Sequence, residues 1–269
     1  MAGFLKGMDM KRVDLINMKY PVDELGQPKV TGLVLSVHDY QEHDGVIHLA
    51  TPNEIYSVLA KGIQRETSKN RRIALPGSKV QVVYDPQYSR DMLYLIRGSS
   101  ERYYWKMNDS LEFQTLNAIL SILIERHGIT PTIYSSLEEC WKASEEASES
   151  LVLFYACLIV CEILKNTGTI MNVDECNVCG GTSKIAGISQ RQGGFVCLDH
   201  INLEQGDVLF SKVQLRQLRW LIKVPHSKLD TLKQVPWDWS LLIFLLDWYV
   251  YTNDAPIKSL PFLKSLLNM

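Results

Sequence analysis

The sequence contains few cysteines and no run of apolar residues long enough to cross a membrane. Its six cysteines in 269 residues are too few and too irregularly spaced for the disulfide framework of a small secreted protein. The first thirty residues lack the uninterrupted apolar core of a signal peptide. The most apolar stretch, residues 235–250, contains Pro236, Asp238 and Asp247, so it predicts a buried helix rather than a membrane span of about 20 residues. These absences predict a protein of the reducing cytoplasm with no membrane partner.

An excess of positive charge is also lacking. The chain has 28 Lys and Arg against 30 Asp and Glu, which gives a formal net charge of −2. A protein with this balance cannot hold nucleic acid through bulk charge, so any such binding must be local. The sequence likewise has no glycine-rich phosphate loop, no GxSxG elbow and no HExxH motif. It predicts neither a nucleotide site nor a catalytic triad, and we expect a protein that is not an enzyme.

We assign residues 1–30 to an N-terminal extension or linker. The rest of the chain has two parts, which differ in the spacing of their apolar residues. Residues 31–105 hold five short β-rich runs, and a closed barrel suits them because closure removes exposed strand edges. Residues 106–269 have helical spacing, interrupted at 171–204 by a segment rich in glycine and cysteine. We therefore predict an α+β protein in which an N-terminal OB-fold β-barrel is followed by an all-α domain with a zinc-finger-like insert. The expected strands are 30–37, 45–50, 54–60, 79–84 and 91–97, and helices are expected again at 208–224 and 239–252.

The strongest chemical signal is Cys176-Asn-Val-Cys179 followed by Cys197-Leu-Asp-His200. Two residues between ligands let both side chains point inward from one tight turn, and Gly180 permits the backbone geometry in which amides turn toward a thiolate. Three thiolates and one imidazole suit Zn²⁺, and four protein ligands fill its tetrahedron without leaving a place for a water nucleophile. The sequence therefore predicts one structural Zn²⁺ per chain.

These residues have two other interpretations. The four side chains could be unrelated core residues, or they could belong to a zinc deaminase. A deaminase needs an HxE pair ahead of its PCxxC motif, and the sequence contains no HxE. Cys140, Cys157 and Cys161 are a separate case, because the last two lie four residues apart in an apolar run where cysteine behaves as a small hydrophobe. We expect these three to pack in the core.

The densest positive charge lies in residues 60–80, where six basic residues accompany one acidic residue, Glu66. The six are candidates for DNA binding: Lys61, Arg65, Lys69, Arg71, Arg72 and Lys79. A positive loop beside strands that carry Tyr56, Tyr84 and Tyr94 is suited to follow a single-stranded backbone while the rings stack on bases. Each feature also has a plainer interpretation, since charge runs often only solvate a loop and tyrosines can fill a barrel interior.

A second basic feature is formed by Lys212, Arg216, Arg219 and Lys223, whose spacing places all four on one face of the expected helix. We expect Val208, Leu215, Leu218 and Ile222 to lie elsewhere around the same helix. Such a face is suited to dock an acidic peptide or DNA phosphates. The alternative is an ordinary solvated helix face.

Short motifs follow one another in a fixed order along both parts of the chain. In the first part they are Gly32-Leu-Val-Leu35, Asp39-Tyr40-Gln-Glu42-His-Asp44, Thr51-Pro52, Ala60-Lys61-Gly62, Ser68-Lys69 and Leu75-Pro76. In the second part they are Gly193-Gly194 with Cys197 in the insert, then Lys258-Ser259 and Phe262-Leu263. In this order, over about residues 30–269, they resemble the bacterial recombination and DNA-repair mediator family RecO.

The resemblance implies an OB-fold, a helical domain and a zinc-finger-like insert within it. RecO proteins bind single- and double-stranded DNA, anneal complementary strands, contact the acidic C-terminal tail of the single-strand DNA-binding protein, and work with RecR to load the RecA recombinase. The resemblance also implies a bacterial cytoplasmic protein associated with the nucleoid. Lys61 is the only basic residue for which the resemblance implies a role in DNA binding. The other basic residues are candidates because of their charge alone. The rival functions are a zinc-dependent nucleic-acid-processing enzyme and a protein-interaction scaffold without DNA binding.

Overall fold

The computed structural model of the protein describes residues 21–85 and 92–269. The chain divides into two compact units. One comprises the chain up to Ser110 together with Gly128–Tyr134, and the other comprises Leu111–His127 and Ser135–Met269. The predicted extension at 1–30 lies largely outside the described residues, since 1–20 are not described. Its remainder folds onto the barrel, because Val22 bridges to Pro28 and Arg97 contacts the Asp23 carboxylate.

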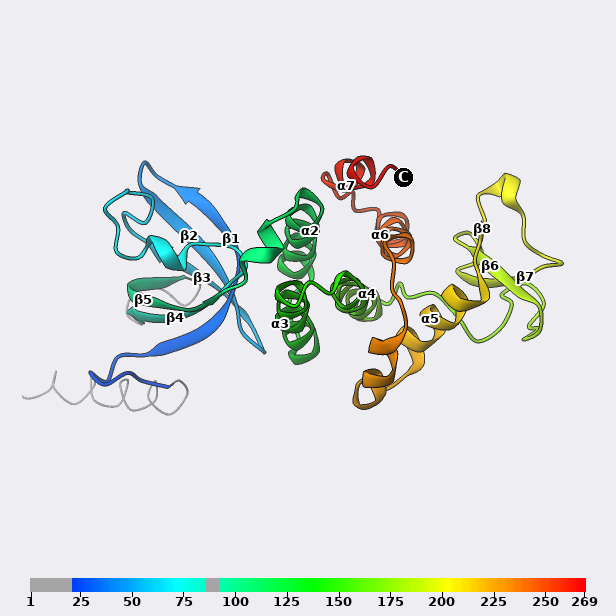
Figure 1. The fold of residues 1–269 in the computed structure, drawn as a ribbon, viewed down its shortest axis with the longest axis horizontal. Coiled ribbons are helices and arrows are strands. Elements are labelled where there is room, and N and C mark those ends of the chain that lie inside the picture. Colours follow the sequence, from blue (N-terminus) through cyan, green and yellow to red (C-terminus); the bar gives the residue numbers. More distant parts are fainter. Residues whose placement is uncertain (1–20, 86–91) are drawn as a thin grey trace, which may run out of the picture. The chain divides into compact units, whose positions relative to one another are not determined.

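Five strands form a closed barrel in the first unit (Figure 1). They are β1 (Lys29–Tyr40), β2 (Asp44–Ala50), β3 (Ile55–Ala60), β4 (Ser78–Asp85) and β5 (Leu93–Tyr103). Their order around the barrel is β1-β2-β3-β5-β4, and all neighbours are antiparallel except β3 and β5. The predicted five-stranded barrel followed by helices is confirmed, and the arrangement is consistent with an OB-fold.

Alternating side chains fill the barrel, as the period of two residues in a strand requires. On β4, Val80, Val82 and Tyr84 are buried in the barrel core, whereas Lys79 before Val80 and Gln81 after it are only half-buried. The last strand is longer than predicted because β5 continues to Tyr103, which pairs with Ser78 at the start of β4. The predicted start of that strand, Asp91, lies outside the described residues.

Helices make up most of the second unit: α2 (Leu111–His127), α3 (Pro131–Glu145), α4 (Glu149–Asn166), α5 (Lys212–Lys223), α6 (Trp239–Asn253) and α7 (Leu260–Leu266), with the 3-10 helix η4 (His226–Gln234). Twelve residues of α4 are buried, and the helix packs against α2, α5 and α6. The apolar stretch at 235–250 supplies most of α6, as predicted. Among the described residues, none of the helices combines the length and apolar character that a membrane crossing requires.

The insert between α4 and α5 contains a small sheet that the sequence did not predict. Its strands β6 (Ile185–Ser189), β7 (Gly194–Cys197) and β8 (Val208–Leu209) lie in the order β7-β6-β8. The prediction of a helix from residue 208 was wrong at its start, because Val208 pairs with Ile188 of β6. The helix begins only at Lys212, where Ser211 and Gln214 form a reciprocal capping box.

Candidate metal centre and nucleic-acid surface

Four predicted metal ligands from two separate segments of the insert meet at one point. Cys176 and Cys179 flank a tight turn, Cys197 ends β7, and His200 lies in the turn that follows. The donor atoms of all four lie within 4.8 Å of one another. Nδ1 of His200 is 3.1 Å from the sulfur of Cys197 and 3.8 Å from that of Cys176. A tetrahedral metal ion with bonds of about 2.0–2.3 Å fits a donor set of this size.

Backbone hydrogen bonds bring the two segments together. The N–H of Gly180 donates to the carbonyl of Cys176 at 2.8 Å, which closes the first turn, and Gly180 has the left-handed φ of +69° that favours glycine. Asn172 bridges to Gly194 on β7, where a Cβ would lie only 2.2 Å from the Asn172 carbonyl oxygen. Glycine at 194 therefore permits the close approach that places Cys176 beside Cys197.

The surroundings of the cluster favour a thiolate at one cysteine. Burial disfavours the charged form of Cys176, but backbone N–H groups of Cys179, Cys197 and Val178 favour it, and the net effect lowers the pKa of the Cys176 thiol to about 6. The Cys197 N–H donates to that sulfur at 3.4 Å. At Cys179 the N–H of Gly181 is the largest single influence and favours the thiolate, but the Cys176 and Cys197 sulfurs together with desolvation outweigh it and raise the pKa of the Cys179 thiol. Two thiolates side by side repel each other, and a bound divalent cation removes that repulsion.

The donor set also limits what a metal could do here. Three sulfurs and one imidazole nitrogen supply four protein ligands, which is the complement of a closed tetrahedral site. A closed site has no open position for a water molecule or a substrate. The cluster can therefore hold a metal ion in a structural role.

The predicted DNA-binding residues occupy the connection between β3 and β4 and the beginning of β4. Arg65 and Lys69 are exposed in successive turns, and Arg71 and Arg72 are exposed in the 3-10 helix η1 (Arg71–Ile73). Lys61 is exposed directly after β3, whereas Lys79 is half-buried on β4. Among the described residues, no acidic group forms an ion pair with Arg65, Lys69, Arg71 or Arg72. We call these four residues the basic loop.

Apolar anchors hold the basic loop against the barrel. Ile63, which precedes the four basic residues, and Ile73, which follows them, are both 1% exposed and belong to the barrel core. The Ile73 side chain lies over Gly98 of β5, and the Gly98 N–H donates to the Asn70 side chain at 3.4 Å. With these side chains fixed inward, the intervening cationic groups are directed into solvent.

The three tyrosines that the sequence offers for base stacking lie in different environments. Tyr84 is 3% exposed and fills the barrel interior, which is the plainer of the two interpretations. Tyr56 is partly buried against the same core, and its hydroxyl contacts Glu54. Tyr94 is half-buried at the surface, and the Lys61 ammonium lies 5.3 Å from its ring centroid. Tyr94 is therefore the ring placed beside a candidate DNA-binding cation.

The four basic residues of the second feature are all exposed on α5, opposite the buried side chains Leu215, Leu218 and Leu221. We call Lys212, Arg216, Arg219 and Lys223 the α5 stripe. Val208 does not belong to this helix, since it lies on β8.

Cys140, Cys157 and Cys161 are buried in the same unit, and burial raises the pKa of the Cys140 and Cys161 thiols to about 12.

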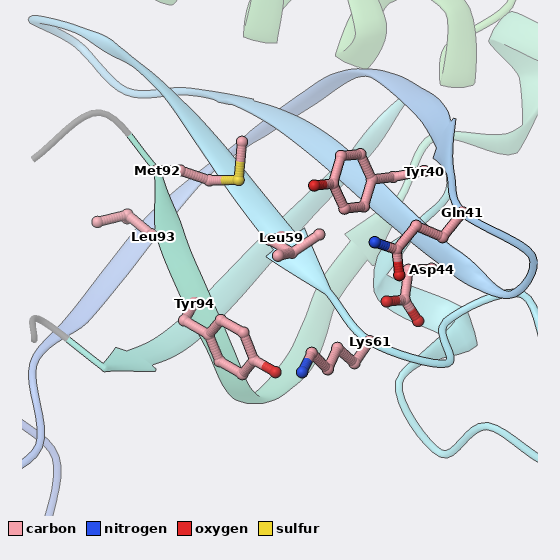
Figure 2. Close-up of a pocket in the computed structure, with 8 residues that line it drawn as sticks. All are labelled: Tyr40, Gln41, Asp44, Leu59, Lys61, Met92, Leu93 and Tyr94. Atoms are coloured by element: carbon pink, nitrogen blue, oxygen red, sulfur yellow. The ribbon is translucent and has the colours of Figure 1, made fainter. Parts of the chain in front are cut away.

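A surface pocket beside Lys61 was not identified from the sequence. It includes Tyr40 and Asp44 from the β1–β2 hairpin and Tyr94 from β5 (Figure 2). Tyr40 and Asp44 belonged to one short motif, but nothing in the sequence indicated that β5 would lie next to them. The parallel pairing of β3 with β5 determines that neighbourhood.

Comparison with known families gives two matches that cover most of the chain. The family model described as "Recombination protein O N terminal" matches residues 27–103. The model described as "Recombination protein O C terminal" matches residues 113–261. No curated protein matches the chain.

Proposed function

Because the chain belongs to the RecO family of recombination and DNA-repair mediators, we propose that it anneals complementary single strands. In this proposal it also acts with RecR to help load RecA onto DNA coated by single-strand DNA-binding protein. The observation that carries the proposal is the basic loop, whose four cations are exposed on the barrel and form no ion pair among the described residues. Cations that are not neutralised by protein carboxylates are available to phosphates.

Annealing requires two polyanions to approach each other. Each phosphate that meets a Lys or Arg side chain releases condensed counterions, and this release supplies a favourable, salt-dependent free energy. The basic loop and Lys61 would neutralise strand charge, while the Tyr94 ring would stack on an unpaired base. No covalent bond is made or broken in such a reaction, so the activity is not enzymatic.

The metal centre has a supporting role in this proposal. We assign one Zn²⁺ to Cys176, Cys179, Cys197 and His200, where it would join the two segments of the insert. The ion would neutralise the crowded thiolates and stabilise the fold of the insert. It would take no part in strand pairing, because all four of its positions are filled by the protein.

The α5 stripe is the proposed dock for the acidic C-terminal tail of the single-strand DNA-binding protein. Exposed Val213 lies on the same helix, and the exposed Leu209 of β8 precedes it, so apolar and cationic groups occur together. An acidic peptide with an apolar end would match this combination. Contact with the tail would bring the annealing surface to coated DNA.

A strand-annealing assay on the purified full chain tests the main proposal. Two complementary oligonucleotides, labelled with a donor and an acceptor fluorophore, are mixed with and without protein, and the rise in energy transfer is followed. We expect the protein to accelerate pairing at low salt and to lose this effect at high salt. A non-complementary pair is the control. Equal pairing rates with and without protein, under conditions where the protein binds each strand, would contradict the annealing activity.

A further inference from the structure

A pocket of about 350 Å³ opens on the barrel at the end of β3. Its wall is built from three places in the sequence: the β1–β2 hairpin, the end of β3 with the residue after it, and the start of β5. The lining residues are Tyr40, Gln41, Asp44, Leu59, Lys61, Met92, Leu93 and Tyr94 (Figure 2). Ligand pockets in proteins commonly measure about 300–1,000 Å³, so this one has room for a single flat ring system and its sugar.

Strand pairing makes one side of the pocket apolar. Leu59 of β3 lies opposite Tyr94 of β5 in the parallel register, and Val58 lies opposite Leu93. Met92 and Leu93 extend this side away from Lys61 (Figure 2). An aromatic ring together with aliphatic side chains gives a surface on which a planar heterocycle can stack.

The opposite end of the pocket carries hydrogen-bonding groups. Asp44 and Gln41 lie side by side there, and Tyr40 lies above them (Figure 2). The Gly62 N–H donates to Oδ1 of Asp44 at 2.7 Å, which fixes the carboxylate. Among the described residues, Oδ2 of Asp44 and the Gln41 carboxamide have no hydrogen-bonding partner. The Lys61 ammonium, beside the Tyr94 ring, adds a cationic donor.

This arrangement of acceptors and donors discriminates between the four DNA bases. A carboxylate accepts two parallel N–H bonds, and guanine alone presents two adjacent donors, N1–H and the N2 amine, on its Watson–Crick edge. Its O6 and N7 atoms are acceptors that a lysine ammonium can reach. Thymine offers a single N–H between two carbonyl oxygens, which a carboxylate would repel.

We propose that this pocket receives one unpaired guanine of single-stranded DNA, with the base stacked on Tyr94 and its Watson–Crick edge on Asp44. The inference rests on the proposed single-strand binding and adds base selection at one position of the strand. Lys61 joins the pocket to the basic loop, so the strand that places a base here would continue along the cationic surface. The protein would bind all remaining nucleotides of the strand through their phosphates alone. Only the nucleotide in this pocket would therefore have a preferred base.

The test compares a short thymidine oligomer with the same oligomer carrying one central guanine, by fluorescence anisotropy at fixed salt. We expect the parent protein to bind the guanine strand about tenfold more tightly. In Asp44→Asn, this ratio should fall to about twofold or less, because the amide places a donor against the donors of guanine. Asp39→Asn is the matched control, since Asp39 is also a barrel carboxylate that accepts a hydrogen bond, from Gln64, and does not line the pocket. Both variants change the net charge equally, so only the guanine ratio separates them.

A second pair of variants tests the stacking surface. Tyr94→Ala should weaken binding of the guanine strand by about tenfold, Tyr94→Phe should retain it, and Tyr103→Ala, outside the pocket, should not change it. Guanine-to-thymine ratios near one in the parent, or an unchanged ratio in Asp44→Asn, would overturn the guanine pocket while leaving strand binding intact. Failure of the parent to bind either strand would instead contradict the proposed function itself. Free deoxyguanosine monophosphate serves as a further probe, and affinity equal to that of the strand would assign the pocket to a free nucleotide.

Discussion

Lys223, the last cation of the α5 stripe, forms an ion pair with Asp174, and its Nζ lies 2.6 Å from the Asp174 carboxylate. Asp174 belongs to the segment that leads into Cys176, so the pair joins α5 to the insert that carries the candidate metal centre. Both side chains are about half exposed, and such pairs contribute only about 0–1 kcal/mol to stability. Its main effect is on the stripe, because it leaves Lys212, Arg216 and Arg219 as the cations without an ion pair among the described residues.

Charge reversal on the α5 stripe should abolish binding of an acidic tail peptide. In Arg216→Glu, Arg219→Glu, two attractive charges become repulsive, and we expect the affinity of a fluorescent peptide to fall at least about tenfold. Lys223→Ala should change it by less than about twofold, because that cation already has a carboxylate partner. Lys228→Glu, Lys258→Glu is the control for total charge. Equal affinities in the parent and the double reversal, measured by anisotropy, would leave the stripe as ordinary surface.

The metal centre predicts a stoichiometry and a stability effect. Protein purified without chelator should contain about one equivalent of zinc, measured by atomic emission. Cys179→Ser should lose most of the metal and lower the thermal midpoint by roughly 5–10 °C, because metal binding is coupled to folding of the insert. Val178→Ser is the matched control, since Val178 is an exposed neighbour that supplies no ligand atom. Protein without stoichiometric metal, and an unchanged midpoint in Cys179→Ser, would refute the assignment.

The basic loop predicts a change in salt dependence. Replacing Arg65, Lys69, Arg71 and Arg72 together with Ala should weaken single-strand binding and flatten the slope of log affinity against log salt by about 0.7 for each lost phosphate contact. Sequence preference should not change, because phosphates carry no base information. A variant with Lys184, Arg191, Lys228 and Lys258 replaced by Ala removes the same charge from the second unit and serves as control. Parallel slopes for the parent and the loop variant would place the DNA surface elsewhere.

The three buried cysteines of the helical unit should not react with alkylating reagents in the native protein. Burial raises the pKa of Cys140 and Cys161 to about 12 and raises that of Cys157 as well, so at pH 8 all three remain protonated thiols. Alkylating reagents attack thiolates, and we expect these three residues to stay unlabelled in the native protein at pH 8. Unfolding in denaturant should expose all of them to labelling. Mass spectrometry identifies the labelled sites, and rapid native labelling of Cys157 would contradict its placement in the core.

The barrel and the clustering of Cys176, Cys179, Cys197 and His200 could be predicted because their signals are local. Alternation along β4 indicates a strand whatever its neighbours are, and the spacing of Cys176 and Cys179 indicates a turn with two ligands. The start of α5 was missed because Val208 and Leu209 continue the apolar pattern of the helix. Only their pairing with β6 and the capping box at Ser211 exclude them from it.

Features that depend on distant neighbours could not be predicted. Tyr84 and Tyr94 both lie in predicted strands, yet one fills the barrel while the other lines a surface pocket. The difference is set by strand register, which brings Leu59 beside Tyr94. The ion pair of Lys223 could not be predicted either, because Asp174 lies in an irregular segment far from α5 in sequence.

The barrel closes through a short seam. In the described part of the chain, β3 and β5 pair through Val58 with Leu93 and Leu59 with Tyr94. Segments distant in sequence must meet there, so loop-closure entropy opposes the contact, and we expect it to form late in folding and to open early in native-state hydrogen exchange. Three side chains of this seam also line the pocket, so a seated base would span both strands. Ligand binding would then favour the closed barrel by mass action, and a bound strand would protect these amides from exchange.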